Sequence, residues 1–66
     1  MTTAEQLLAE GETKGRAAAL IEILTHRFGE LDPEARTRIE SADLDRLHTW
    51  TRRQWDATRL EDVFTD

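Results

Sequence analysis

Residues 3–28 read TAEQLLAEGETKGRAAALIEILTHRF, and this stretch decides the fold because its composition is that of one long helix. Thr2 and Thr3 are candidate caps for its start, because a threonine hydroxyl can accept a hydrogen bond from a free backbone amide of the first turn. Arg27 suits the negative end of the helix dipole, and Gly29 supplies the left-handed residue that commonly follows a helix. At about 1.5 Å per residue, the predicted helix is about 39 Å long.

The second half of this helix carries a stripe of apolar residues. When side chains are placed at about 100° per residue, the stripe occupies an arc of about 100°. Its members are Ala17, Leu20, Ile21, Leu24 and Phe28. We expect this stripe to pack against the rest of the chain and to end near Thr13, where the same side of the helix becomes polar.

The first half of the helix carries a second face, about 140° away from the core stripe. Its small and apolar members are Leu7, Leu8, Gly11, Gly15, Ala18 and Ala19. Glycine inside an exposed helix costs about 1 kcal/mol relative to alanine, so two glycines require an explanation. Close approach of another backbone is one explanation, and a flexible lead-in to the core helix is the other. We predict that this face is a protein interface.

The length of the chain and its lack of cysteine limit how stable it can be alone. Its 66 residues make one domain at most, and it contains no cysteine. A domain of this size buries only about 60% of the surface of its unfolded chain, so its own stability is marginal. Without disulfides or a thiolate metal site, oligomerisation is the usual remedy for a small core. We therefore expect a homo-oligomer, and a dimer before any larger assembly.

The net charge argues against nucleic acid as a partner, and the short apolar runs argue against a membrane. Nine Lys and Arg residues oppose 14 Asp and Glu residues, which gives a formal net charge of −5. This charge disfavours nucleic-acid binding, which depends on neutralising phosphates. The longest apolar run, residues 17–21, is far shorter than the ~20 residues that span a bilayer, and the acidic start does not resemble a secretory signal. The expected location is the cytoplasm, without membrane contact.

Three shorter helices are predicted after Gly29. Asp32 followed by Pro33 is a helix start, because aspartate caps well and proline suits the first helical position, and this helix runs to about Glu40. Asp43 can cap a third helix over residues 44–57. Its inner face is predicted to hold Leu44, Leu47, Thr51 and Trp55, with Trp50 at the edge.

The last short helix begins at a possible capping box formed by Thr58 and Glu61. Its apolar residues, Leu60, Val63 and Phe64, can fold back onto the core. The predicted fold is therefore all-α, with one long N-terminal helix packed against two to three shorter helices. Because the core is small, we expect this unit to assemble as a helical-bundle homo-oligomer. Residues 1–16 form its projecting connector or oligomerisation segment, and residues 17–66 form the small helical domain.

Three segments carry a resemblance to a known family. They are EGETKGR at 10–16, THRFG at 25–29 and TRLEDVF at 58–64. With the residues between the second and third segments, they resemble a small helical domain of unknown function at the C-terminal end of bacterial transposase-like proteins of the Rpn or YhgA type, whose upstream domain is restriction-endonuclease-like. Those intervening residues are Ile39, Glu40, Leu44, Leu47 and Trp50. No position here matches the catalytic carboxylates of that upstream domain. The resemblance implies an accessory or oligomerisation module rather than a nuclease.

Candidate chemical sites are few. Glu22, His26 and Glu30 are spaced by four, and imidazole with carboxylate can bind a divalent metal. Because Gly29 ends the helix before Glu30, a surface pair of Glu22 and His26 is the simpler interpretation, and no metal site is predicted. The sequence contains no recognisable motif for nucleophilic catalysis, phosphate binding or zinc binding, so no enzyme activity, catalytic residue or cofactor is predicted.

Trp50 and Trp55 flank two arginines, a mixture that can stack on bases and bind phosphates. Five residues apart on a helix, however, the two rings point about 140° from one another and cannot form one platform. We expect at least one ring in the core. The leading prediction is a non-enzymatic helical self-association or accessory module, and the alternative is an acidic protein-binding module that docks on another protein, such as a nuclease-like partner.

Overall fold

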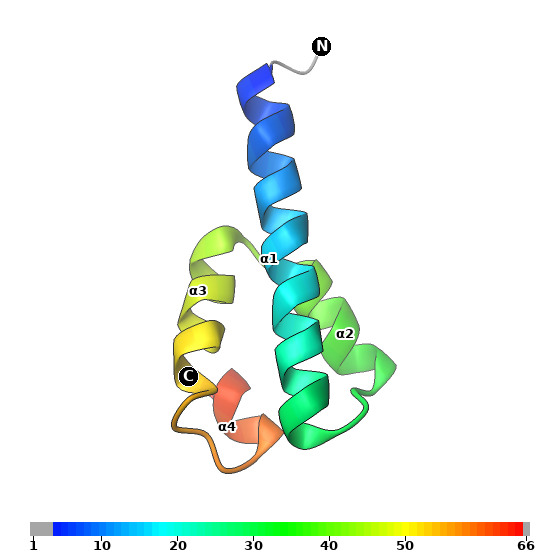
Figure 1. Cartoon of the computed structure of the whole chain (residues 1–66), viewed down its shortest axis with the longest axis vertical. Coiled ribbons are helices and arrows are strands. Elements are labelled where there is room, and N and C mark those ends of the chain that lie inside the picture. Colours follow the sequence, from blue (N-terminus) through cyan, green and yellow to red (C-terminus); the bar gives the residue numbers. More distant parts are fainter. Residues whose placement is uncertain (1–3, 66) are drawn as a thin grey trace.

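The computed structural model describes residues 4–65, apart from the side chains at positions 5–7 and 9. This part of the chain forms helices and no strand, which confirms the all-α prediction. The helices are α1 (Ala4–Phe28), α2 (Pro33–Glu40), α3 (Leu44–Arg53) and α4 (Leu60–Phe64), as Figure 1 shows. None of the described helices is long and apolar enough to cross a bilayer.

The shorter helices gather around the second half of α1. In Figure 1, α2 and α3 lie on either side of that half, and α4 lies beside the end of α3. The first half of α1 extends beyond them, which makes the molecule long and narrow, 42 × 20 × 17 Å. From residue 4 to residue 16, every side chain that the structure describes is exposed except that of Thr13, which is half-buried.

The end of α1 is the helix stop that the sequence predicts. Gly29 has a φ of +88°, a conformation that glycine adopts without the steric penalty of a side chain. Its amide donates a hydrogen bond to the carbonyl of Thr25 at 3.0 Å, which closes the last turn. The candidate caps at the other end, Thr2 and Thr3, lie outside the described residues.

Aspartate caps begin α2 and α3. A carboxylate oxygen of Asp32 accepts from the amide of Ala35 at 2.8 Å, and one of Asp43 accepts from the amide of Arg46 at 2.9 Å. Pro33 occupies the first helical position of α2, as predicted. Both predicted starts are therefore confirmed. Because these bonds join residues three positions apart, the start of each helix is set by local sequence.

The core lies between the second half of α1 and the other helices. From the predicted stripe of α1, Ala17, Leu20 and Leu24 are buried, while Ile21 and Phe28 pack against the core partly buried. The other helices and loops contribute further buried apolar residues: Leu31, Ala35, Ile39, Leu47, Trp50, Ala57 and Val63. The stripe prediction is thus confirmed, and it explains why the shorter helices cover this half of α1 and not the first half.

The structure corrects the prediction for α3. The helix ends at Arg53 instead of residue 57, because the amides of Trp55 and Asp56 bond carbonyls three residues back and tighten the chain into a turn. The buried face is also rotated by about 60° from the predicted one. It holds Leu47 and Trp50 with Gln54 at the end of the helix, while Trp55 is 73% exposed.

The turn after α3 allows α4 to close the core. Val63 is fully buried, and the ring of Phe64 meets that of Trp50 edge to face, with ring centres 4.9 Å apart. Arg53 holds this end of the chain by donating to the carbonyls of Val63 and Thr65. The predicted return of the last helix is confirmed, although it begins one residue later than expected: the amide of Arg59 donates to the Asp62 carboxylate at 3.2 Å.

Candidate functional site

The predicted interface on α1 lies on the surface of the chain. Leu8 is 75% exposed, and Gly11, Gly15, Ala18 and Ala19 are exposed as well. The remaining predicted member is Leu7, whose side chain lies outside the described residues. We call the described members the small-residue face of α1. In the part of the chain that the structure describes, nothing covers this face.

The two glycines of the small-residue face have no packing role within the chain. A Cβ atom built at Gly11 or Gly15 meets no neighbouring atom within 4 Å. Neither residue has a positive φ, in contrast to Gly29. Each glycine weakens the helix by about 1 kcal/mol relative to alanine, and no intramolecular contact in the described chain explains this cost.

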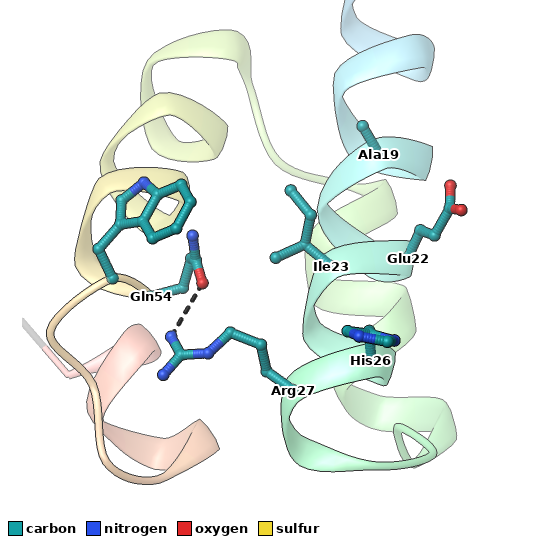
Figure 2. A pocket seen from close by; sticks show the side chains of 7 residues that line it. Ala19, Glu22, Ile23, His26, Arg27 and Gln54 are labelled. Atoms are coloured by element: carbon teal, nitrogen blue, oxygen red, sulfur yellow. Dashed lines mark hydrogen bonds between the residues drawn. The ribbon is translucent and has the colours of Figure 1, made fainter.

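A groove continues the small-residue face between α1 and the end of α3. Its volume is about 480 Å³. The residues lining it are Ala19, Glu22, Ile23, His26, Arg27, Gln54 and Trp55, most of which Figure 2 labels. Ala19 belongs to both surfaces. Leu8, Gly15 and Ala19 also lie within about 40° of one another around the helix axis, so the face leads directly into the groove.

Gln54 is the buried polar group of this groove. Its side chain is fully buried, and its Oε1 atom accepts a hydrogen bond from Nη1 of Arg27 at 2.9 Å. Because a guanidinium can only donate, the oxygen must face Arg27 and the amide nitrogen must face the opposite way. Figure 2 shows this nitrogen on the side away from Arg27, in the space between α1 and α3.

The amide nitrogen of Gln54 has no hydrogen-bond partner among the described residues. A buried donor left without an acceptor costs about 1–3 kcal/mol. The groove therefore combines apolar walls with one unsatisfied donor, and an acceptor entering it would remove that penalty.

Arg27 joins the two sides of the groove. It reaches from the last turn of α1 toward Gln54, as Figure 2 shows, and also donates to the carbonyl of Ala57 at 3.4 Å. Its guanidinium lies 4.9 Å from the ring centre of Phe28, a cation–π distance. The bonds to Gln54 and Ala57 connect the end of α1 to the end of α3 and the turn after it.

Trp55 is the largest exposed apolar side chain on the groove. It was predicted to lie in the core, and the earlier end of α3 places it at the groove instead. Ile23 and Gln54, which also line the groove, were not singled out in the sequence. The signal for Gln54 is its spacing: it follows Leu47 and Trp50 at i+7 and i+4, the positions that continue a helical face.

The residues weighed as metal ligands remain on the surface. Glu22, His26 and Glu30 are exposed, and the first two line the groove. The described residues contain no group of three or more His, Cys, Asp or Glu side chains arranged to hold a metal ion. The groove thus offers an apolar wall, a hydrogen-bond donor and a charged rim.

Comparison of the chain with protein families, curated proteins and solved structures finds no match. The resemblance to the C-terminal domain of transposase-like proteins therefore stays a prediction, and the case for function depends on the surface described above.

Proposed function

We propose that this chain is a non-enzymatic self-association module that forms a homodimer through the small-residue face of α1. The observation that carries the proposal is the exposure of Leu8 at 75% on a half-helix that extends away from the core. Next to it, Gly11 and Gly15 leave the backbone open to close approach. A second helix laid on this face would bury Leu8 and meet no side chain at either glycine.

The marginal size of the domain supports the same proposal. An isolated helix of about 13 residues is marginal in water, so the first half of α1 gains little from its own backbone hydrogen bonds. Pairing with a second copy would supply the tertiary contact that it lacks. Association would also offset the weakening of α1 by the two glycines.

The test is a pair of leucine substitutions measured by sedimentation equilibrium. The variant Gly11→Leu with Gly15→Leu fills the space for a second backbone, and overpacking of this kind costs about 1–3 kcal/mol. Leucine is a better helix former than glycine, so α1 itself is retained. We expect a concentration-dependent dimer for the unchanged chain and a dissociation constant at least about fivefold higher for the variant.

The matched control is Glu10→Leu with Lys14→Leu. These exposed positions have the same spacing of four but lie about 100° around α1 from the glycines, and their replacement leaves the net charge unchanged. The control separates closure of the face from the general effect of added leucines. A monomer at all concentrations for the unchanged chain, or equal weakening by both variants, would contradict the proposal. A monomer would direct attention to the alternative, a different protein as partner.

A further inference from the structure

We propose that the groove beside Gln54 receives the first half of α1 from a second copy, with the two α1 helices antiparallel and crossing near Gly15. This inference rests on the proposed self-association and specifies its geometry. It assigns Leu8 of the second copy to the apolar part of the groove. It also assigns Glu12 of that copy as the acceptor for the unpartnered amide of Gln54.

The spacing of residues along α1 supports this register. When two antiparallel copies cross at Gly15, residues whose numbers add to about 30 lie opposite one another. Gly11 then faces Ala19 of the second copy, so small residues meet small residues on both sides of the crossing. Leu8 faces Glu22 and Ile23, which line the groove. Along the helix axis, Glu22 in the groove and Leu8 each lie about 10 Å from Gly15, in opposite directions. Leu8 of the second copy therefore reaches the groove.

Charge favours the antiparallel direction over the parallel one. Residues 4–14 contain three glutamates and one lysine, whereas residues 15–28 contain two arginines and His26 against one glutamate. An antiparallel pair places each acidic half on the basic half of the other copy. A parallel pair would place the two acidic halves together, which opposes association.

The unsatisfied amide supplies an observation independent of the small-residue face. Gln54 is fully buried, and its nitrogen faces the groove without an acceptor in the described chain. Glu12 is exposed, lies one turn after Leu8, and is about 40° from it around the axis, on the side that also carries Ile23. In the proposed register, Glu12 lies opposite Ala18, next to Ala19 at the edge of the groove. A carboxylate there can accept from the Gln54 amide.

Disulfide crosslinking tests the register, because the chain contains no cysteine of its own. A chain with Leu8→Cys is mixed with a mass-tagged chain carrying Glu22→Cys under mild oxidation. The antiparallel register predicts that the mixed 8–22 crosslink forms about tenfold faster than the 8–8 or 22–22 product, because only the mixed pair brings the thiols within bonding distance. The control mixture is Glu10→Cys with Glu22→Cys, which places one thiol off the face.

The outcomes separate this inference from the proposed function. A dominant 8–8 crosslink would mean a parallel dimer, so self-association would stand and the register would fall. A mixed 8–22 rate no higher than that of the control would also overturn the register. If sedimentation shows only monomer and no pair crosslinks above the control, both proposals fall together.

A second variant tests the role of the amide. Gln54→Glu keeps the length of the side chain and an oxygen that can accept from Arg27, and it replaces the amide donor with a second acceptor. We expect the dimer dissociation constant to rise about tenfold, while the circular dichroism spectrum of the folded chain is retained. An unchanged dissociation constant would overturn the assignment of Glu12 and Gln54 as partners.

Discussion

The side chain of Gln54 is buried because one guanidinium pairs with its carbonyl oxygen. Arg27 supplies the 2.9 Å bond, and it remains exposed enough to keep the rest of its charge in water. The amide oxygen therefore has a hydrogen-bond partner, whereas the amide nitrogen faces the groove without one in the described chain. At the scale of single residues, this asymmetry distinguishes the groove from ordinary surface.

The two tryptophans are expected to differ sharply in their effect on stability. Trp50 is 5% exposed and packs against Phe64, so Trp50→Ala should lower the free energy of unfolding by about 3 kcal/mol or more. Trp55 is 73% exposed, and Trp55→Ala should change the free energy of unfolding by less than about 0.5 kcal/mol. Urea titration followed by circular dichroism, at concentrations that keep the chain monomeric, measures both.

Similar losses for the two variants would show that Trp55 also packs in the core. If Trp50→Ala fails to fold, Trp50→Phe provides the measurable comparison, because it keeps an aromatic ring beside Phe64. The prediction requires that substitution of Trp50 lowers the free energy of unfolding more than substitution of Trp55.

Sequence periodicity identified the presence of a buried ring in α3 but not the right ring. Leu44, Leu47, Thr51 and Trp55 form a plausible helical stripe, and a tryptophan is a stronger core candidate than a glutamine. In the structure, Gln54 takes the buried position and accepts a hydrogen bond from Arg27, 27 positions away in the sequence. A local pattern carries no information about such a contact.

At the scale of helices, the caps of α2 and α3 should each stabilise the domain. Asp32→Ala and Asp43→Ala each remove an acceptor for a first-turn amide, and we expect each to lower the free energy of unfolding by about 1 kcal/mol. Asp56→Ala is the control, because Asp56 is exposed in the turn after α3 and caps no helix. Thermal unfolding followed by circular dichroism measures all three. A control as destabilised as the cap variants would mean that charge, and not capping, is responsible.

The helices were largely predictable because their boundaries depend on local chemistry. Asp32 with Pro33, Asp43 and Gly29 act within a turn of their own positions, and all four are visible in the sequence. The end of α3 was missed because no glycine or proline marks it. There the chain turns so that Ala57 and Val63 reach the core, which is a tertiary requirement.

At the scale of the whole molecule, the two halves of α1 should exchange their amide hydrogens at different rates. Residues 17–28 carry the core stripe, so their amides should exchange only when the domain unfolds. Residues 4–16 extend from the core and should exchange much faster in dilute solution. Dimerisation should slow the exchange of residues 4–16 as concentration rises. Hydrogen exchange followed by mass spectrometry at about 10 µM and about 1 mM would measure the change.

Uniform protection along α1 at the lower concentration would contradict this division of the helix. Protection of the first half that is independent of concentration would contradict pairing through it. The exchange of residues 17–28 serves as the internal reference for both comparisons.

The site was only partly predictable from the sequence. The small-residue face follows from helical angles within α1, and the described residues lie exposed where expected. The groove could not be predicted, because it forms between segments that meet only after folding: Ile23 and Arg27 on α1, with Gln54 and Trp55 from the end of α3.

The unequal environments of the two indoles give the molecule a built-in optical readout. Trp50 is shielded and Trp55 faces the groove, so iodide in solution should quench the fluorescence of Trp55 and leave most of that of Trp50. Emission from Trp50 would then report unfolding, while quenching of Trp55 would report occupation of the groove. Unfolding and occupation of the groove could thus be measured in the same sample without an added label.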